Sequence, residues 1–276
     1  MDADETTAAS KFAKAARAGQ ALQDELIIDA HAHMGLWFNF HIPAYDADAM
    51  VETMDSIGVD LCICSPHRAI GPDYRAGNEE VIEAAGRFPG RFVPYITINP
   101  YYPLAEIERE IEKWHSQEQL RAFKIHPSFA SYPADGEGYR PVWEHANEHG
   151  LTVLSHSSAG DKHGSPKMLG ELAKRYPKSN VLVAHSASGW DMIEVATQAA
   201  KEHENVYLDL CGSPLLFGGL ERMVDAVGAE RILFGTDLPF IDPRPGLGRV
   251  AFSRISDDEK RKILGLNARR MFRITE

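Results

Sequence analysis

The amino-acid sequence predicts an α/β fold, a (β/α)8 TIM barrel that forms a single domain. Three observations support this fold class. Short apolar runs typical of buried strands recur at intervals of roughly 25–35 residues, the length of one strand–helix unit. Stretches with the helical spacing of apolar residues lie between these runs. The chain of 276 residues has room for eight such units, because barrels of this kind typically take about 250 residues.

The predicted strands follow one another along the whole chain. They are Leu26–Ala30, Val59–Cys64, Phe92–Ile98, Ala122–Ile125, Leu151–Leu154, Val181–Ala184, Val206–Leu210 and Arg231–Phe234. Helical spacing is clear between them, for example over Met168–Tyr176. Glycines such as Gly58, Gly150 and Gly228 mark where helices end. A last helix is predicted around Asp258–Phe272.

Alternating strands and helices imply parallel strands joined by right-handed crossovers. The main rival is a doubly wound open sheet, but no glycine-rich phosphate loop follows any strand. The barrel domain is predicted to span residues 25–276, after an N-terminal extension over residues 1–24. That extension is rich in alanine and lacks a core-sized apolar cluster, so we expect a frayed or loosely docked helix there.

Charge and composition exclude several classes of partner. The 29 Lys and Arg residues against 40 Asp and Glu give a net charge of −11, which argues against nucleic acid and anionic membranes. No apolar stretch approaches the ~18 residues of a membrane span, and no secretory signal is seen. Cys62, Cys64 and Cys211 form no disulfide framework and no zinc-type pair. We therefore expect a cytoplasmic protein whose partner is a small-molecule substrate.

A closely spaced histidine pair follows the first predicted strand. His31 and His33 come directly after Leu26–Ala30. Residues two apart on an extended strand point to the same side, so the two imidazoles are presented together. This geometry suits one metal ion.

Polar residues also end later strands, where packing gives no reason for them. They are Lys124, His126, His156, His185 and Asp237. In a (β/α)8 barrel, functional residues lie at the carboxyl ends of the strands, so these side chains are predicted to converge at one mouth. Imidazole and carboxylate ligands together suit zinc best, with manganese and iron as alternatives.

These segments resemble a known family, the metal-dependent amidohydrolase superfamily. Within it the chain is similar to the amidohydrolase-related group that includes aminocarboxymuconate-semialdehyde-type decarboxylases. The matching motifs are IDAHAH at 28–33, FKIHP at 123–127, LSHSS at 154–158, VAHSASG at 183–189 and FGTDLPF at 234–240. The resemblance covers residues 26–273. Together the motifs are specific for the superfamily, but they do not identify the substrate.

The resemblance implies roles for individual residues. His31 and His33 match the metal ligands of the first strand, His156 the ligand of the fifth, and Asp237 the ligand of the eighth. In relatives with one ion, the residue that matches His185 is not a ligand but an acid–base group beside the reacting atoms. Asp237 also matches the residue that acts as catalytic base in the hydrolytic relatives.

Lys124 leaves the number of ions open. In two-ion relatives a carboxylated lysine of the fourth strand bridges the metals, and His156 and His185 then hold the second ion. In one-ion relatives a lysine at this position has no bridging role. We favour one ion and an unmodified Lys124. His126, two residues further on, is predicted to contact the substrate.

Other substrate contacts are predicted from the loops after the first two strands. Arg68 could bind a substrate carboxylate with its planar guanidinium group. Trp37 could form one wall of a site for a flat substrate, with Phe38 and Phe40 beside it.

The leading functional prediction is metal-assisted hydrolysis of a small amide, lactone or ester, with Asp237 as base and His185 stabilising the oxyanion. The alternative is metal-dependent, non-oxidative decarboxylation of a small unsaturated or aromatic acid, since the same residues serve both reactions. A binding module without activity is a third hypothesis, which the complete ligand set disfavours. The family resemblance also implies a possible homodimer.

Overall fold

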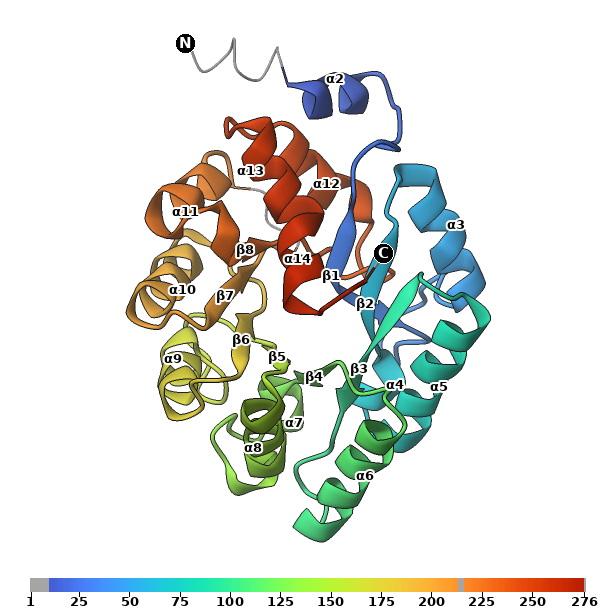
Figure 1. Cartoon of the computed structure of the whole chain (residues 1–276), viewed down its shortest axis with the longest axis vertical. Coiled ribbons are helices and arrows are strands. Elements are labelled where there is room, and N and C mark those ends of the chain that lie inside the picture. The colour runs from blue at the N-terminus through green and yellow to red at the C-terminus, as the bar shows by residue number, and fades with distance from the viewer. Residues whose placement is uncertain (1–9, 213–215, 276) are drawn as a thin grey trace.

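Eight parallel strands surrounded by helices form the fold (Figure 1). The computed structural model describes residues 10–212 and 216–275. The strands pair in sequence order and are β1 Ile28–Met34, β2 Leu61–Pro66, β3 Phe92–Thr97, β4 Ala122–Ile125, β5 Thr152–Ser155, β6 Asn180–Val183, β7 Val206–Asp209 and β8 Ile232–Leu233. Backbone hydrogen bonds from Ala30 N to Phe234 O (2.8 Å) and from Asp237 N to His31 O (2.9 Å) close the ring. The predicted (β/α)8 barrel is confirmed.

Helices cover the outside of the barrel. They are α2 Lys11–Arg17, α3 Ala47–Ile57, α4 His67–Ile70, α5 Tyr74–Arg87, α6 Leu104–Ser116, α7 Pro127–Ala130, α8 Arg140–His149, α9 Pro166–Arg175, α10 Trp190–Glu202, α11 Gly219–Val227, α12 Pro243–Ala251, α13 Asp257–Arg261 and α14 Asn267–Met271. Short 3-10 segments are η1 Glu137–Tyr139 and η2 Ala229–Arg231, and the π-helical η3 Lys262–Leu266 joins α13 to α14. No helix within the described ranges is both long and apolar enough to cross a bilayer.

Local signals explain where these helices begin and end, and α3 is an example. The Asp46 side chain accepts a hydrogen bond from Ala49 N (2.9 Å), which satisfies a free donor at the N-terminus of the helix. Met50 and Met54, one turn apart, are buried against the barrel. Gly58 ends the helix at φ 79°, and a Cβ there would lie 2.9 Å from Leu22 N. Glycine is therefore required at this position.

The N-terminal extension is docked more firmly than expected. Residues 1–9 lie outside the described residues, but α2 follows them, and Phe12 in it is fully buried. Ser10 Oγ donates to Asp257 Oδ1 (2.6 Å) and accepts from Lys260 Nζ (2.9 Å). One buried aromatic ring and this polar anchor hold the segment without a large apolar cluster. The division of the chain near residue 24 stays a prediction.

Alternation along the strands places polar side chains above an apolar floor. Ala122, Leu154 and Leu182 belong to the small apolar cluster inside the barrel. Lys124 and His156 follow two of these positions by two residues, so they point to the same interior side, nearer the carboxyl ends. The barrel interior is thus apolar at one end and polar at the other.

Candidate active site

A bulge in β1 places both histidines of the predicted pair in the site. The register of β1 against β2 shifts between Asp29 and Ala32, which changes the alternation of the strand. β1 also runs on to Met34, so His31 and His33 lie within the strand and not after its end. Their Nε2 atoms lie 3.4 Å and 3.2 Å from Asp237 Oδ1.

Acceptors behind both rings fix the way the histidines face. His31 Nδ1 lies 2.7 Å from Asp209 Oδ2, and His33 Nδ1 lies 3.0 Å from the backbone oxygen of Ser65. In the tautomer with the proton on Nδ1, each Nδ1–H donates to its oxygen and the Nε2 lone pair lies on the side of Asp237. This backing by a carboxylate or carbonyl is the arrangement usual for metal-binding histidines. Lys124 Nζ lies 2.7 Å from His31 Nε2.

The remaining predicted histidines form a chain on the other side of Asp237. His185 Nδ1 lies 3.9 Å from Asp237 Oδ2, and His185 Nε2 lies 3.1 Å from His156 Nδ1. The rings of His156 and His126 stack with centroids 3.9 Å apart. Asp237, His185, His156 and His126 therefore form a continuous line of contacts.

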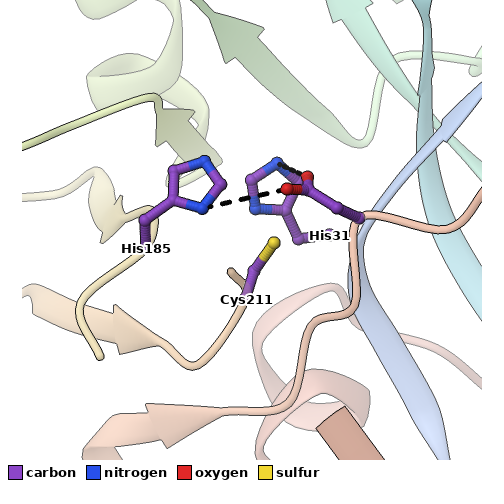
Figure 2. Close-up of side chains that lie close together, drawn as sticks. His31, His185 and Cys211 are labelled. Carbon is purple, nitrogen blue, oxygen red and sulfur yellow. Dashed lines mark ion pairs between the residues drawn. The ribbon is translucent and has the colours of Figure 1, made fainter. Parts of the chain in front are cut away.

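Four side chains offer ligand atoms within 4.8 Å of one another: His31, His185, Cys211 and Asp237. Figure 2 shows His31, His185 and Cys211 directed toward a common centre. Imidazole, thiolate and carboxylate are ligands that zinc accepts, so this donor set fits a divalent transition-metal ion. His33 adjoins the group through Asp237, and His156 through His185. The predicted ligand set of His31, His33, His156 and Asp237 stays a prediction.

Burial and neighbouring charges set the protonation of these groups. Burial, with the Lys124 ammonium, holds the pKa of His31 well below its usual value, so the ring is neutral, as a ligand must be. Burial alone would raise the pKa of Asp237, but His31, His33 and His185 outweigh it and hold that pKa well below its usual range. Burial lowers the pKa of Lys124 to about 8, despite the nearby Asp237.

Two residues of the site adopt a strained backbone. His185 has φ 58° and Asp237 has φ 65°, in the left-handed region that non-glycine residues rarely enter. Each follows the end of an interior strand. Gly235 lies close by, and a Cβ there would be 2.2 Å from Asp209 Oδ1 and 2.8 Å from His31 Cβ. Strain and close approach of this kind are common at functional sites.

A cavity of about 130 Å³ opens above the donor set. It is lined by His33, Trp37, His67, Ile70, His126, His156, His185, Asp237 and Phe240. Trp37 and His126 thus lie where the sequence predicted substrate contacts. Arg68 does not line this cavity; its side chain is 57% exposed and pairs with Asp73 at 2.9 Å. A substrate-binding role for Arg68 stays a prediction.

Sequence reasoning missed His67, which borders the cavity beside Arg68. His67 Nδ1 lies 2.9 Å from Gly35 O, its ring stacks on His33 with centroids 5.0 Å apart, and its Nε2 is buried without a hydrogen-bond partner. Burial next to His33 lowers the pKa of His67 to about 3, so the ring is neutral. A buried, unpaired ring nitrogen is available to a ligand.

Sequence reasoning also missed Asp209 and Cys211. Asp209 orients His31, and burial raises the pKa of this carboxyl to about 6. Cys211 belongs to the possible ligand group, and burial near Asp237 raises the pKa of its thiol well above the usual value. The sequence could have identified them, because both residues lie at the carboxyl end of β7. Polar residues in that position are the feature by which the other site residues were predicted.

Comparison with known proteins identifies the family. The sequence model of the amidohydrolase family matches residues 28–274. The chain belongs to the amidohydrolase family. This confirms the superfamily predicted from the motifs. No curated protein matches the sequence of this amidohydrolase.

Solved structures with the same fold include several decarboxylases. One is 5-carboxyvanillate decarboxylase from Sphingomonas paucimobilis, with 19% identity, a TM-score of 0.72, and coverage of 91% of this chain and 99% of that one. Another is 2,6-dihydroxybenzoate decarboxylase from Rhizobium, with 16% identity, a TM-score of 0.70, and coverage of 91% and 99%. A third is 5-carboxyvanillate decarboxylase from Novosphingobium aromaticivorans, complexed with manganese and 4-hydroxy-3-methoxy-5-nitrobenzoic acid; it has 14% identity, a TM-score of 0.72, and coverage of 92% and 97%. At these identities the likeness shows the fold.

Proposed function

We propose that this amidohydrolase-family protein is a metal-dependent, non-oxidative decarboxylase of a small aromatic or unsaturated acid. The observation that carries the proposal is the cavity, which joins a metal-type donor set at its floor to aromatic rings at its walls. Trp37 and Phe240 border it with ring centroids 5.8 Å apart. The two rings meet edge to face and form one apolar wall against which a flat substrate can pack. The decarboxylases that share the fold support this reaction above the hydrolysis predicted first from the sequence.

The residues of this chain would hold one divalent ion, zinc or manganese, through His31 and Asp237 together with neighbouring donors. When bound, the ion would supply positive charge that anchors the acid and stabilises charge developing next to its carboxylate. We propose that Lys124 stays unmodified. Its Nζ faces His31 in a fully buried position, where it adds positive potential for an anion.

His185 is the proton donor in this proposal. Decarboxylation breaks the carbon–carbon bond to the carboxylate; CO₂ leaves, the electron pair stays on the substrate carbon, and a proton must be added there. Asp237 is held ionised and carries no proton to give. Burial lowers the pKa of His185, so the ring is mostly neutral near pH 7, and its minor imidazolium form is the stronger acid that gives up the proton. The contact with His156 at 3.1 Å offers a path for reprotonation.

His67 and Trp37 would position the substrate. His67 borders the cavity, and its Nε2 is buried without a hydrogen-bond partner, so a neutral imidazole there can donate to or accept from a ring substituent. Trp37 lies beside it with ring centroids 5.1 Å apart. Together they provide one polar contact and one flat apolar contact.

Product analysis tests the proposal. The purified protein, loaded with Zn²⁺ or Mn²⁺, is incubated with 5-carboxyvanillate, with 2,6-dihydroxybenzoate and with a set of unsaturated acids, and CO₂ is measured alongside loss of the acid. A parallel set contains lactones, esters and amides. We expect CO₂ in a 1:1 ratio to the acid consumed, and a large loss of rate in His185→Asn. Turnover of the lactone, ester or amide set with no CO₂ from any acid would refute decarboxylation in favour of hydrolysis.

A further inference from the structure

A second group of histidines lies outside the active site, on two neighbouring helices. His115 is near the end of α6, and His145 and His149 are in the last turns of α8. The spacing of four residues puts His145 and His149 on one face of α8. Figure 1 shows α6 and α8 on the same side of the barrel, and the two helices are in contact.

This group lies at the end of the barrel opposite the active site. Helices of a (β/α)8 barrel run back from the carboxyl ends of the strands, so their last turns are at the amino-terminal end of the barrel. A cleft of about 580 Å³ borders His115 and His149 and is also lined by Leu120 and Leu151, which precede β4 and β5. The cleft is separate from the cavity above Asp237.

The three rings have the geometry of a metal-binding triad. His145 Nε2 and His115 Nδ1 are 3.3 Å apart, and one ligand nitrogen from each of the three rings lies within 4.8 Å of the other two. Zinc–nitrogen bonds of ~2.0–2.1 Å in a tetrahedron place ligand nitrogens ~3.3–3.4 Å apart. The His115–His145 pair already has this spacing.

The three imidazoles pack on one another, and His145 Nε2 and His115 Nδ1 are within hydrogen-bond distance. Ring centroids are 4.8 Å apart for His115 and His145, and 4.4 Å for each of the two pairs that include His149. Among the described residues, the carboxylate that contacts these rings is that of Glu148, whose Oε2 is 4.0 Å from His149 Nε2. Burial and the two neighbouring rings lower the pKa of His145 to about 4, so its imidazole is neutral and able to bind a metal.

We propose that His115, His145 and His149 form a second, peripheral metal site that binds one divalent transition-metal ion of the zinc class. Three imidazole nitrogens coordinate the ion, and the remaining position opens toward the cleft. Binding links the end of α6 to the end of α8 and stabilises this part of the barrel. The proposal is independent of the reaction proposed for the active site.

Zinc stoichiometry and affinity test the site. Protein that holds its active-site ion is titrated with Zn²⁺ against a chromogenic chelator at pH 7.5. We expect one further equivalent in the wild type, and at least a tenfold weaker affinity for it in His149→Ala and in His145→Gln. His203→Gln is the matched control, because His203 is a half-buried histidine at the end of α10, outside the triad. Asp237→Ala, which alters only the active site, should keep the peripheral equivalent.

Thermal unfolding provides a second measurement. Added Zn²⁺ should raise Tm in the wild type and in His203→Gln, but not in His149→Ala. His149 is about one-third exposed on its side chain, so its removal should leave the metal-free Tm nearly unchanged and keep the test valid. Equal zinc affinity in wild type and His149→Ala, or no further equivalent in the wild type, would overturn the proposal.

Discussion

The histidines of the active site and those of the α6–α8 triad (His115, His145 and His149) differ in whether an oxygen acceptor holds the second ring nitrogen. His31 and His33 project from a strand, and an oxygen acceptor on the far side of each ring fixes its orientation. The triad projects from helix ends and is backed by no comparable acceptor among the contacts described, apart from Glu148 at 4.0 Å. Rigid, backed ligands favour tight binding and defined chemistry. Half-buried ligands without such acceptors favour weaker binding, with an effect on stability.

The largest effect is expected from Asp237→Asn. The amide cannot supply the negative charge that lies 3.2–3.4 Å from the Nε2 atoms of His33 and His31. We expect the fold and most of the metal to remain, while turnover falls by a factor on the order of 10²–10⁴. Circular dichroism, metal content and rate are measured on the same sample. Near-normal turnover would contradict the role given to Asp237.

Removing the backing of His31 should have the next largest effect. Asp209→Asn keeps the shape of the side chain but loses the charge that orients the His31 ring at 2.7 Å. We expect a 10–100-fold loss of active-site metal affinity, the usual cost of such a change. Competition with a chelator measures it, with the exposed Asp48→Asn as control. An unchanged metal affinity at the active site would show that the oxygen acceptor on the second ring nitrogen does not distinguish the two histidine groups.

The fold could be predicted from the sequence because each strand–helix unit carries its own local signals. The site could be predicted only in part. Strand ends pointed to His31, His156, His185 and Asp237, but the contact between His31 and Asp209 joins residues 178 positions apart. No local pattern encodes such a pair. The bulge in β1 is likewise a property of the paired sheet.

Which of two adjacent residues faces the cavity could not be predicted from the sequence either. His67 and Arg68 are neighbours at the start of α4, and only the three-dimensional path of that turn directs His67 inward. His67→Gln should therefore raise KM about tenfold, equivalent to ~1.4 kcal/mol of lost substrate binding, with a smaller change in kcat. Arg68→Gln is the matched control and should change KM less than twofold. The reverse result would restore the role predicted for Arg68.

The pH dependence of folding stability tests the lowered pKa of the buried His67 imidazole. His67 is neutral in the folded protein because its pKa is lowered to about 3, whereas it titrates near 6.5 when unfolded. Between these values the unfolded chain binds more protons, so stability falls as the pH drops below about 6.5. In metal-free protein, His67→Gln should reduce this slope by up to ~1.4 kcal/mol per pH unit. Denaturant unfolding at pH 6 and pH 4 measures it; identical slopes would contradict the lowered pKa.

The smallest effect is expected on catalysis when the α6–α8 triad is altered. His149→Ala changes a side chain at the opposite end of the barrel from Asp237, and the interior between them is filled by the apolar cluster that includes Ala122 and Leu154. We expect this packed layer to keep the two ends of the barrel uncoupled. Turnover at saturating substrate should therefore change less than twofold, with or without added Zn²⁺. A tenfold lower turnover in His149→Ala, together with a tenfold rise in wild-type turnover when Zn²⁺ is added, would show that the peripheral ion acts on the reaction. The two histidine groups would then be coupled.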